Sequence, residues 1–268
     1  MHWLLEPDVF GEGPPPLLEP ARRAGHEVTI WRDDWWSSQG FPRIEDDRVV
    51  FHGSLGNAAR IATQLATRQR WSPGAYCNEQ RIRCSAWYPA AQRWSLNQRY
   101  IATTVGALCA DPRAVVKGLG EGLDAIFVRP DSPLKPFSGR VVHLEGLTPG
   151  NLDHGFYYDD LALPIVVAPV NAIHEEWRFV AVGGVVITGS GYLAQGRRST
   201  GSVPPAPAWA LAETIARELP APDPVYVLDL GHIEDGLRLV EINPFSGSDL
   251  HACDLDAIVT AVAASAVQ

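Results

Sequence analysis

The stretch that decides the fold is VYVLDLGHIEDGLRLVEINPF, residues Val225 to Phe245. Two runs of alternating apolar residues flank a turn, which is the pattern of a β-hairpin. The turn ends in Gly236, and glycine readily adopts the left-handed conformation that the last position of a three-residue hairpin loop requires. We therefore expect Glu234–Gly236 to form the loop and Ile233 to pair with Leu237.

That register places two carboxylates on one face of the hairpin. Counting back from the loop pairs Asp229 with Glu241, and residues that face each other across two strands share a side of the sheet. Asn243, two residues further on, points the same way. A two-residue turn would instead put Asp229 and Glu241 on opposite faces, so the prediction depends on the longer loop.

Two adjacent carboxylates in apolar strands repel each other unless a positive charge compensates them. The oxygens of Asp229, Glu241 and Asn243 suit Mg²⁺ that is bound together with nucleotide phosphates. The alternative is that one carboxylate is exposed and the other forms an ordinary salt bridge. We favour the metal site because Asn243 adds a third oxygen where Pro244 ends the strand.

The composition is that of an ordinary globular protein, with 268 residues, 46% hydrophobic and 20% charged. Its formal net charge of −9 argues against nucleic acid or an anionic membrane as a partner. We find no apolar run of about 20 residues and no signal peptide, so we expect a cytoplasmic protein. The sequence does not indicate an oligomeric state. The cysteines, expected as reduced thiols without metal spacing, are Cys77, Cys84, Cys109 and Cys253.

Residues 1–90 are predicted to form a small Rossmann-like α/β domain with a parallel sheet. It has no GxGxxG fingerprint, and three prolines follow Gly11 and Gly13, so dinucleotide binding is not expected there. Its expected strands are 1–5, 27–31 and 49–52, and its expected helices are 17–24 and 57–67.

Two further segments are expected, 91–164 and 165–268. In the first we predict a helix over Ser95–Ala110, strands over Ala114–Lys117, Ala125–Arg129 and Arg140–Leu144, and a polar loop over Pro130–Gly139. In the second, the expected strands are 163–170, 177–182, 185–190, 225–230 and 237–243, and the expected helices are 209–219 and 254–267.

The order of these motifs resembles the ATP-grasp superfamily. Asp229 followed by Glu241-Ile-Asn243-Pro244, with a glycine at Gly247, is similar to that family's magnesium motif. Upstream, Glu176-Trp-Arg178 resembles its acidic-x-Arg strand. The stretch VVAPV, residues 166–170, resembles the strand and hinge that hold adenine through backbone groups.

One position departs from the common family pattern. The first-lobe strand ends in Phe127-Val-Arg129-Pro130, where the family commonly has lysine before proline, and Lys135 follows in the loop. This resembles a clade in which arginine takes the usual lysine position and a displaced lysine contacts phosphate.

The resemblance implies a fold in which two α+β lobes, 91–164 and 165–268, grip ATP after the N-terminal domain 1–90. It implies Mg²⁺ and ATP as cofactors, and closure of the Asp131–Ser138 loop over the phosphates. The implied metal ligands are Asp229, Glu241 and Asn243, the implied catalytic cations are Arg129, Lys135 and Arg178, and the implied nucleotide contacts are Lys135, Ser138, Ala168, Val170 and Glu176.

The expected activity is ATP-dependent ligation of a carboxylate to an amine through an acylphosphate, with an amino acid or peptide as substrate. A kinase that phosphorylates a hydroxyl and a nucleotide-binding module without turnover are the alternatives. For single residues, Lys135 is alternatively a solvated loop lysine, and Arg178 is alternatively the partner of Glu176 or another carboxylate.

Overall fold

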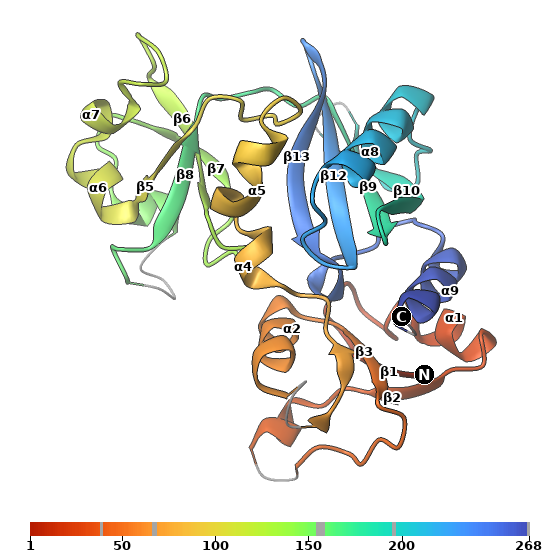
Figure 1. Ribbon diagram of the computed structural model, residues 1–268. Helices are drawn as coiled ribbons and strands as arrows, with labels where there is room; N and C mark the ends of the chain where they lie inside the picture. The colour runs from red at the N-terminus through yellow and green to blue at the C-terminus, as the bar shows by residue number, and fades with distance from the viewer. Residues whose placement is uncertain (38–39, 66–68, 154–158, 195–196, 267–268) are drawn as a thin grey trace.

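The computed structural model describes residues 1–37, 40–65, 69–153, 159–194 and 197–266, which form three sheets in three lobes (Figure 1). The N-terminal unit has a parallel sheet in the order β2-β1-β3-β4, which confirms the expected parallel arrangement. Its elements are β1 (His2–Leu5), α1 (Leu18–Arg23), β2 (Glu27–Ile30), η1 (Asp33–Trp36), β3 (Arg48–His52), α2 (Leu55–Arg60), the π-helix η2 (Ile61–Leu65) and β4 (Ser72–Gly74).

The next lobe, called the first lobe below, has an antiparallel sheet in the order β5-β8-β6-β7. Two short helices, α4 and α5, lead into it and lie between it and the third sheet (Figure 1). The elements of this part are α4 (Glu79–Ile82), α5 (Cys84–Ala91), β5 (Ile101–Thr104), α6 (Val105–Ala110), α7 (Pro112–Val116), β6 (Ala125–Pro130), β7 (Arg140–His143), η3 (Pro149–Leu152) and β8 (Pro164–Ala168).

The second lobe has an antiparallel sheet in the order β11-β10-β9-β12-β13. Helices α5 and α8 bury one of its faces, whereas α9 and the N-terminal unit pack on the valine-rich end of the other face. The elements are β9 (Glu175–Val182), β10 (Val185–Ala194), β11 (Arg197–Arg198), α8 (Ala206–Glu218), β12 (Val225–Ile233), β13 (Gly236–Pro244), η4 (Phe245–Gly247) and α9 (Leu255–Ser265). The segment bounds 1–90, 91–164 and 165–268 stay a prediction.

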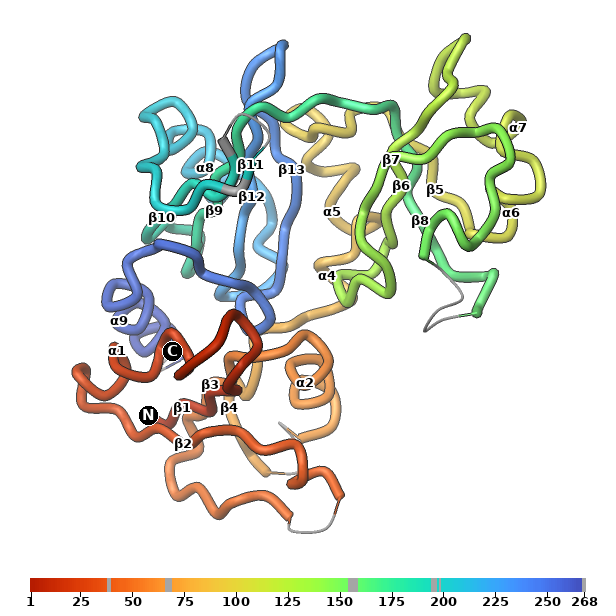
Figure 2. The backbone as a smooth tube through the Cα atoms, turned by 180° about the vertical axis from the view of Figure 1, so that it is seen from behind, coloured from red at the N-terminus to blue at the C-terminus, as the bar shows by residue number. Residues whose placement is uncertain are grey.

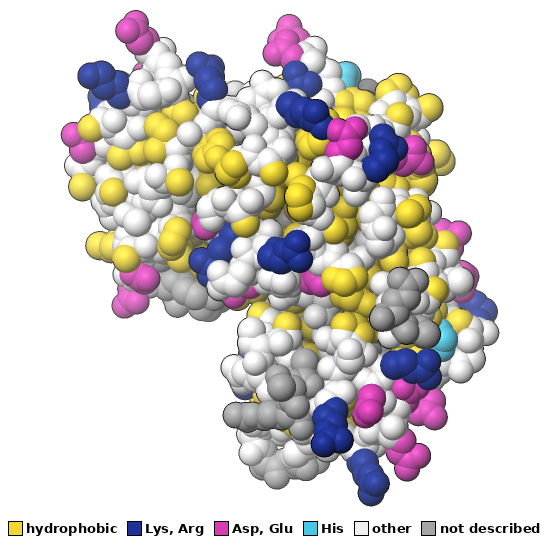
Figure 3. Space-filling model, in the orientation of Figure 1, with side chains coloured by type: hydrophobic (Ala, Val, Ile, Leu, Met, Phe, Trp, Pro, Cys, Tyr) yellow, Lys and Arg dark blue, Asp and Glu magenta, His cyan; other side chains and the backbone are white. Residues whose placement is uncertain are grey.

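The two ends of the chain lie near each other, because α9 returns to pack beside α1 (Figure 2). Arg23 in α1 forms a bidentate ion pair with Asp256 in α9, with Nη2–oxygen distances of 2.7 and 2.8 Å. On the face drawn in Figure 3, the Lys and Arg side chains of the described residues are interspersed with Asp and Glu. No described helix is both long and apolar enough to span a bilayer.

Two sequence predictions in the first lobe are wrong. The segment expected as one helix from Ser95 to Ala110 contains β5 and the shorter α6, because Ser95 bridges to Leu239 of the other lobe and the β-branched residues of β5 pair with β8. Residues 114–117, expected as a strand, belong largely to helix α7. Asp111 caps this helix by accepting a hydrogen bond from the backbone N–H of Ala114 at 3.0 Å.

The hairpin turn also differs from the prediction. Ile233 pairs with Gly236 and not with Leu237, so the turn has two residues. A register shift then occurs between Leu230, which pairs with Leu239, and Asp229, which pairs with Glu241. Val240 is therefore the extra residue of a β-bulge, and the bulge moves the following residues of β13 by one position.

His52 is buried where the N-terminal sheet meets the loop after β13. Its ring lies between Phe10 and Phe245, with centroid distances of 4.8 and 5.2 Å, and its Nε2 is 3.0 Å from the carbonyl oxygen of Ser248. Because that carbonyl is an acceptor, Nε2 carries the proton. Burial lowers the pKa of His52 to about 4, although the Ser248 carbonyl acts in the opposite direction.

We therefore predict acid sensitivity at His52. In the unfolded chain its pKa returns to about 6.5, so the unfolded state binds more protons between pH 6.5 and 4. The stability that comes from a neutral His52 is complete above pH 6.5 and falls by up to about 3 kcal/mol as the pH drops towards 4. Denaturant unfolding at pH 7, 5 and 4 should show the advantage of the unmodified chain over His52→Gln shrinking by that amount. An advantage that does not change with pH would contradict this assignment.

Candidate active site

Three neighbouring strands bring one charged side chain each into a single row. Arg178 on β9 faces Asp229 on β12, and Asp229 faces Glu241 on β13. Residues paired in this way project from the same side of the sheet. The predicted pairing of Asp229 with Glu241 is thus confirmed, but the bulge at Val240 produces it and not a three-residue loop.

Arg178 neutralises the most deeply buried of these charges. Its Nε and Nη2 donate to Oδ1 and Oδ2 of Asp229 at 2.8 and 2.7 Å, and Asp229 is only 1% exposed. Nη1 donates to the carbonyl oxygen of Asp249 at 2.6 Å. Burial alone would lower the pKa of Arg178, but the Asp229 carboxylate raises it above its usual value. Because all three nitrogens are engaged, Arg178 holds Asp229 in place.

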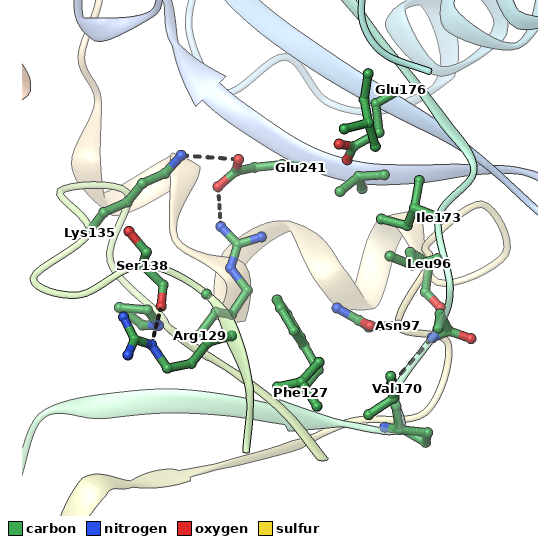
Figure 4. A pocket seen from close by; sticks show the side chains of 18 residues that line it. Leu96, Asn97, Phe127, Arg129, Lys135, Ser138, Val170, Ile173, Glu176 and Glu241 are labelled. Atoms are coloured by element: carbon green, nitrogen blue, oxygen red, sulfur yellow. Dashed lines mark hydrogen bonds and ion pairs between the residues drawn. The ribbon is translucent and has the colours of Figure 1, made fainter. Parts of the chain in front are cut away.

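Glu241 is neutralised by cations from the other lobe. It forms an ion pair with Arg129 at the end of β6, and its Oε2 accepts a hydrogen bond from Nζ of Lys135 at 3.1 Å (Figure 4). Burial favours a higher pKa for Glu241, but Arg129 and Lys135 together lower it to about 2. Both hairpin carboxylates are therefore paired and neither is an exposed surface group.

Asn243 completes the predicted metal-ligand set. Its Nδ2 donates to Oδ2 of Asp229 at 2.9 Å, so the amide turns its nitrogen towards that carboxylate. Ligation of a metal by its oxygen would require the amide to rotate. Within the described residues, no group of three or more His, Cys, Asp or Glu residues gathers around one metal position. Two carboxylates and one amide fit Mg²⁺ whose remaining ligands come from phosphates and water.

A cavity of about 530 Å³ lies between the first lobe and the second-lobe sheet, next to this charged row. Its polar end carries Arg129, Lys135, Ser138 and Glu241, whereas Leu96, Ile173 and Val170 lie at its other end (Figure 4). The full lining consists of Leu96, Asn97, Phe127, Arg129, Pro130, Lys135, Ser138, Gly139, Arg140, Val141, Pro169, Val170, Asn171, Ile173, Glu176, Leu193, Val240 and Glu241.

The structure places the predicted site residues in three positions. Six of them line the cavity, namely Arg129, Lys135, Ser138, Val170, Glu176 and Glu241. Three others, Arg178, Asp229 and Asn243, are not in the lining and form the hydrogen-bonded group beside Glu241 on the same sheet. Ala168 is fully buried in β8, where it pairs with Phe127, and its side chain does not reach the cavity. Their roles stay predictions.

Glu176 is the acidic residue nearest to the apolar end of the cavity. Burial raises its pKa to about 7, and the nearby Asp229 carboxylate adds to this effect. The raised pKa favours the protonated form of Glu176, which limits its repulsion of an anionic ligand.

Sequence reasoning missed several lining residues. Phe127 lies two residues before Arg129 on β6, and Val240 lies one residue before Glu241 on β13. Their closeness to predicted site residues was therefore a partial signal. No signal in the sequence pointed to Asn97, since this residue was expected within a helix and lies in a turn. It reaches the cavity because the turn segment before β5 is joined to β13 by the bridge between Ser95 and Leu239.

The comparisons agree with this geometry. The sequence matches the model of an ATP-grasp domain, the third family of its clade, over residues 36–262. Solved structures that share the fold include D-cycloserine synthetase DcsG, with 16% identity, a TM-score of 0.65 and coverage of 99% of this chain and 100% of that one. The ATP-grasp ligase PsnB, complexed with a minimal precursor, has 11% identity, a TM-score of 0.60 and coverage of 98% and 99%.

A third structure is D-alanyl-alanine synthetase A from Vibrio cholerae O1 biovar eltor str. N16961, with 14% identity, a TM-score of 0.58 and coverage of 100% and 99%. At these identities the structures establish the fold alone. No curated protein matches the sequence. The family match spans most of the chain, and the predicted ATP-grasp fold is confirmed by the solved structures. The chain therefore belongs to the ATP-grasp superfamily, in the clade family that the matching model describes.

Proposed function

We propose that this protein is a carboxylate–amine ligase that uses Mg-ATP to activate a carboxylate as an acylphosphate and releases ADP. The main support is the meeting of opposite charges from two lobes in one cavity. Arg129 and Lys135 come from the first lobe, Glu241 comes from the second, and the other end of the cavity is apolar. A nucleotide has the same polarity, with an apolar base at one end and charged phosphates at the other.

Phosphoryl transfer requires charge neutralisation and alignment more than a protein nucleophile. Arg129 and Lys135 would exchange Glu241 for the phosphates and hold their negative charge. Arg178 orients the Asp229 carboxylate through two hydrogen bonds. Mg²⁺ held by Asp229, Glu241 and Asn243 would supply neutralisation of the terminal phosphates.

The 131–139 loop would fold over the phosphates in this proposal. It follows β6 directly and carries Lys135 and Ser138 into the cavity lining. Exclusion of water by such a loop protects an acylphosphate from hydrolysis.

An amino acid or peptide is proposed as one substrate. The proteins of similar fold include a synthetase named for D-alanyl-alanine and a ligase solved with a precursor peptide and AMPPNP. The PsnB ligase has also been solved with Mg and ADP, in keeping with the proposed cofactors. We further propose that the protein acts in the cytoplasm. Its net charge of −9 disfavours nucleic acid or an anionic membrane as a partner, and we propose that it has neither.

Two alternatives make different predictions for the same assay. A kinase would release ADP and form a phosphorylated product without any amine, and a module without turnover would bind ATP and release no ADP. ADP release should therefore be measured against a panel of amino acids and peptides, with each carboxylate tested alone and with an amine. Release that depends on the amine supports the ligase.

Glu241→Gln should lower Mg²⁺-dependent ADP release by about 100-fold or more, because it removes a charged metal ligand. The fold should survive, since the glutamine oxygen can still accept hydrogen bonds from Arg129 and Lys135. The matched control is Glu234→Gln, an exposed residue in the turn of the same hairpin. Steady-state ADP release and a thermal melt of both variants provide the test. Equal turnover in the two variants would remove Glu241 from the metal site.

Lys135→Ala should weaken ATP binding by about 1 to 3 kcal/mol, the usual value of a charge-assisted hydrogen bond. Isothermal titration with ATP measures this directly. The control is Lys117→Ala, because Lys117 is exposed and is the only other lysine in the chain. If both variants bind ATP and turn over like the unmodified protein, Lys135 is a solvated loop lysine.

A further inference from the structure

The end of the cavity away from the cations has a buried amide with one unused hydrogen-bonding atom. Asn97 is 3% exposed and lines the cavity, where Figure 4 shows its amide between Phe127 and Leu96. It comes from the turn segment that precedes β5. Its backbone N–H donates to Oγ of Ser95 at 3.1 Å, which fixes the main chain at this point.

The Asn97 amide is anchored to Tyr88 on α5. Nδ2 donates to the Tyr88 hydroxyl at 3.0 Å, and Tyr88 is fully buried in the core between the lobes. The other amide atom, Oδ1, meets no donor from any residue that the structure describes. Oδ1 is not one of the fully buried polar atoms that lack a hydrogen-bond partner. It is therefore accessible from the cavity that Asn97 lines.

This acceptor is left for a ligand. The neighbouring lining residues Leu96, Phe127, Val170 and Ile173 offer apolar side chains, and a ligand that covered them without a donor for Oδ1 would leave a desolvated acceptor unpaired, at a cost in binding free energy. A ligand that donates one hydrogen bond from a flat apolar body would satisfy both features.

We propose that Asn97 selects the base of the nucleotide, and that its Oδ1 accepts a hydrogen bond from the 6-amino group of adenine. This inference rests on the proposed use of ATP and adds a residue that determines base specificity. Guanine carries a carbonyl oxygen in place of that amino group, so two acceptors would face each other. A purine without any group at that position would leave Oδ1 unpaired. Tyr88 is then a positioning residue, because its hydroxyl engages Nδ2 and leaves Oδ1 for the ligand.

The test is isothermal titration of the full chain with Mg²⁺ and three nucleotides: ATP, GTP and purine riboside 5′-triphosphate, which lacks the amino group. The unmodified protein should bind ATP about 10- to 100-fold more tightly than either analogue. In Asn97→Leu, which keeps a side chain of similar size, ATP affinity should fall to that of purine riboside triphosphate. The affinity for the latter should not fall, because leucine leaves no acceptor unpaired, and this retained affinity also shows that the variant is folded.

Tyr88→Phe supplies a second, independent variant. Loss of its hydroxyl frees the amide to rotate, so the preference for ATP over GTP should shrink while the affinity for purine riboside triphosphate is retained. A substitution that only loosened the core would lower the affinity for all three nucleotides alike.

The outcomes separate this inference from the function on which it rests. Equal affinity of the unmodified protein for ATP and purine riboside triphosphate overturns the role of Asn97 and leaves the ligase proposal standing. Tighter binding of GTP than ATP shows that the amide presents its nitrogen and also overturns it. Failure of all three nucleotides to bind overturns both proposals.

Discussion

The buried carboxylate of Asp229 is the constraint on which the active-site face of this protein depends. It lies in the middle of an otherwise apolar strand, and a charge that is 1% exposed needs a partner from the same protein. Arg178 supplies two hydrogen bonds from the next strand and Asn243 supplies a third. The sheet around this group is apolar on its other face, where α5 and α8 pack. The polar row is therefore confined to the side that faces the first lobe.

The second carboxylate connects the two lobes. Glu241 stands next to Asp229 in the sheet, but its cations come from β6 and the loop after it, more than a hundred residues earlier in the chain. The negative net charge of the protein makes these local cations important for any anionic ligand. They are paired with a carboxylate in this structure. In the proposed reaction, phosphates that attract Arg129 and Lys135 would release Glu241 for a cation, so phosphate binding and metal binding would be linked by exchange.

The bulge in β13 shapes the cavity as well as the register. An ordinary two-residue hairpin would pair Asp229 with Val240 and turn Glu241 to the opposite face. The extra residue instead brings Val240 and Glu241 both into the cavity lining. One supplies apolar surface and the other supplies charge. A local irregularity of one residue therefore creates the boundary between the two ends of the cavity.

The sequence by itself determined the hairpin, the identity of its two carboxylates and the family motifs, because alternation of apolar residues and short motif spacings are local properties of the chain. It also determined Arg129 and Lys135 as cations next to the site. It did not determine the turn length, since a bulge depends on how β13 meets its neighbours. Nor did it determine the non-helical path of Ser95 to Thr104, which comes from pairing with Leu239 and with β8. Asn97 and the partners of Glu241 were decided only by the tertiary structure, because they arise where segments distant in sequence come together and no local pattern records that contact.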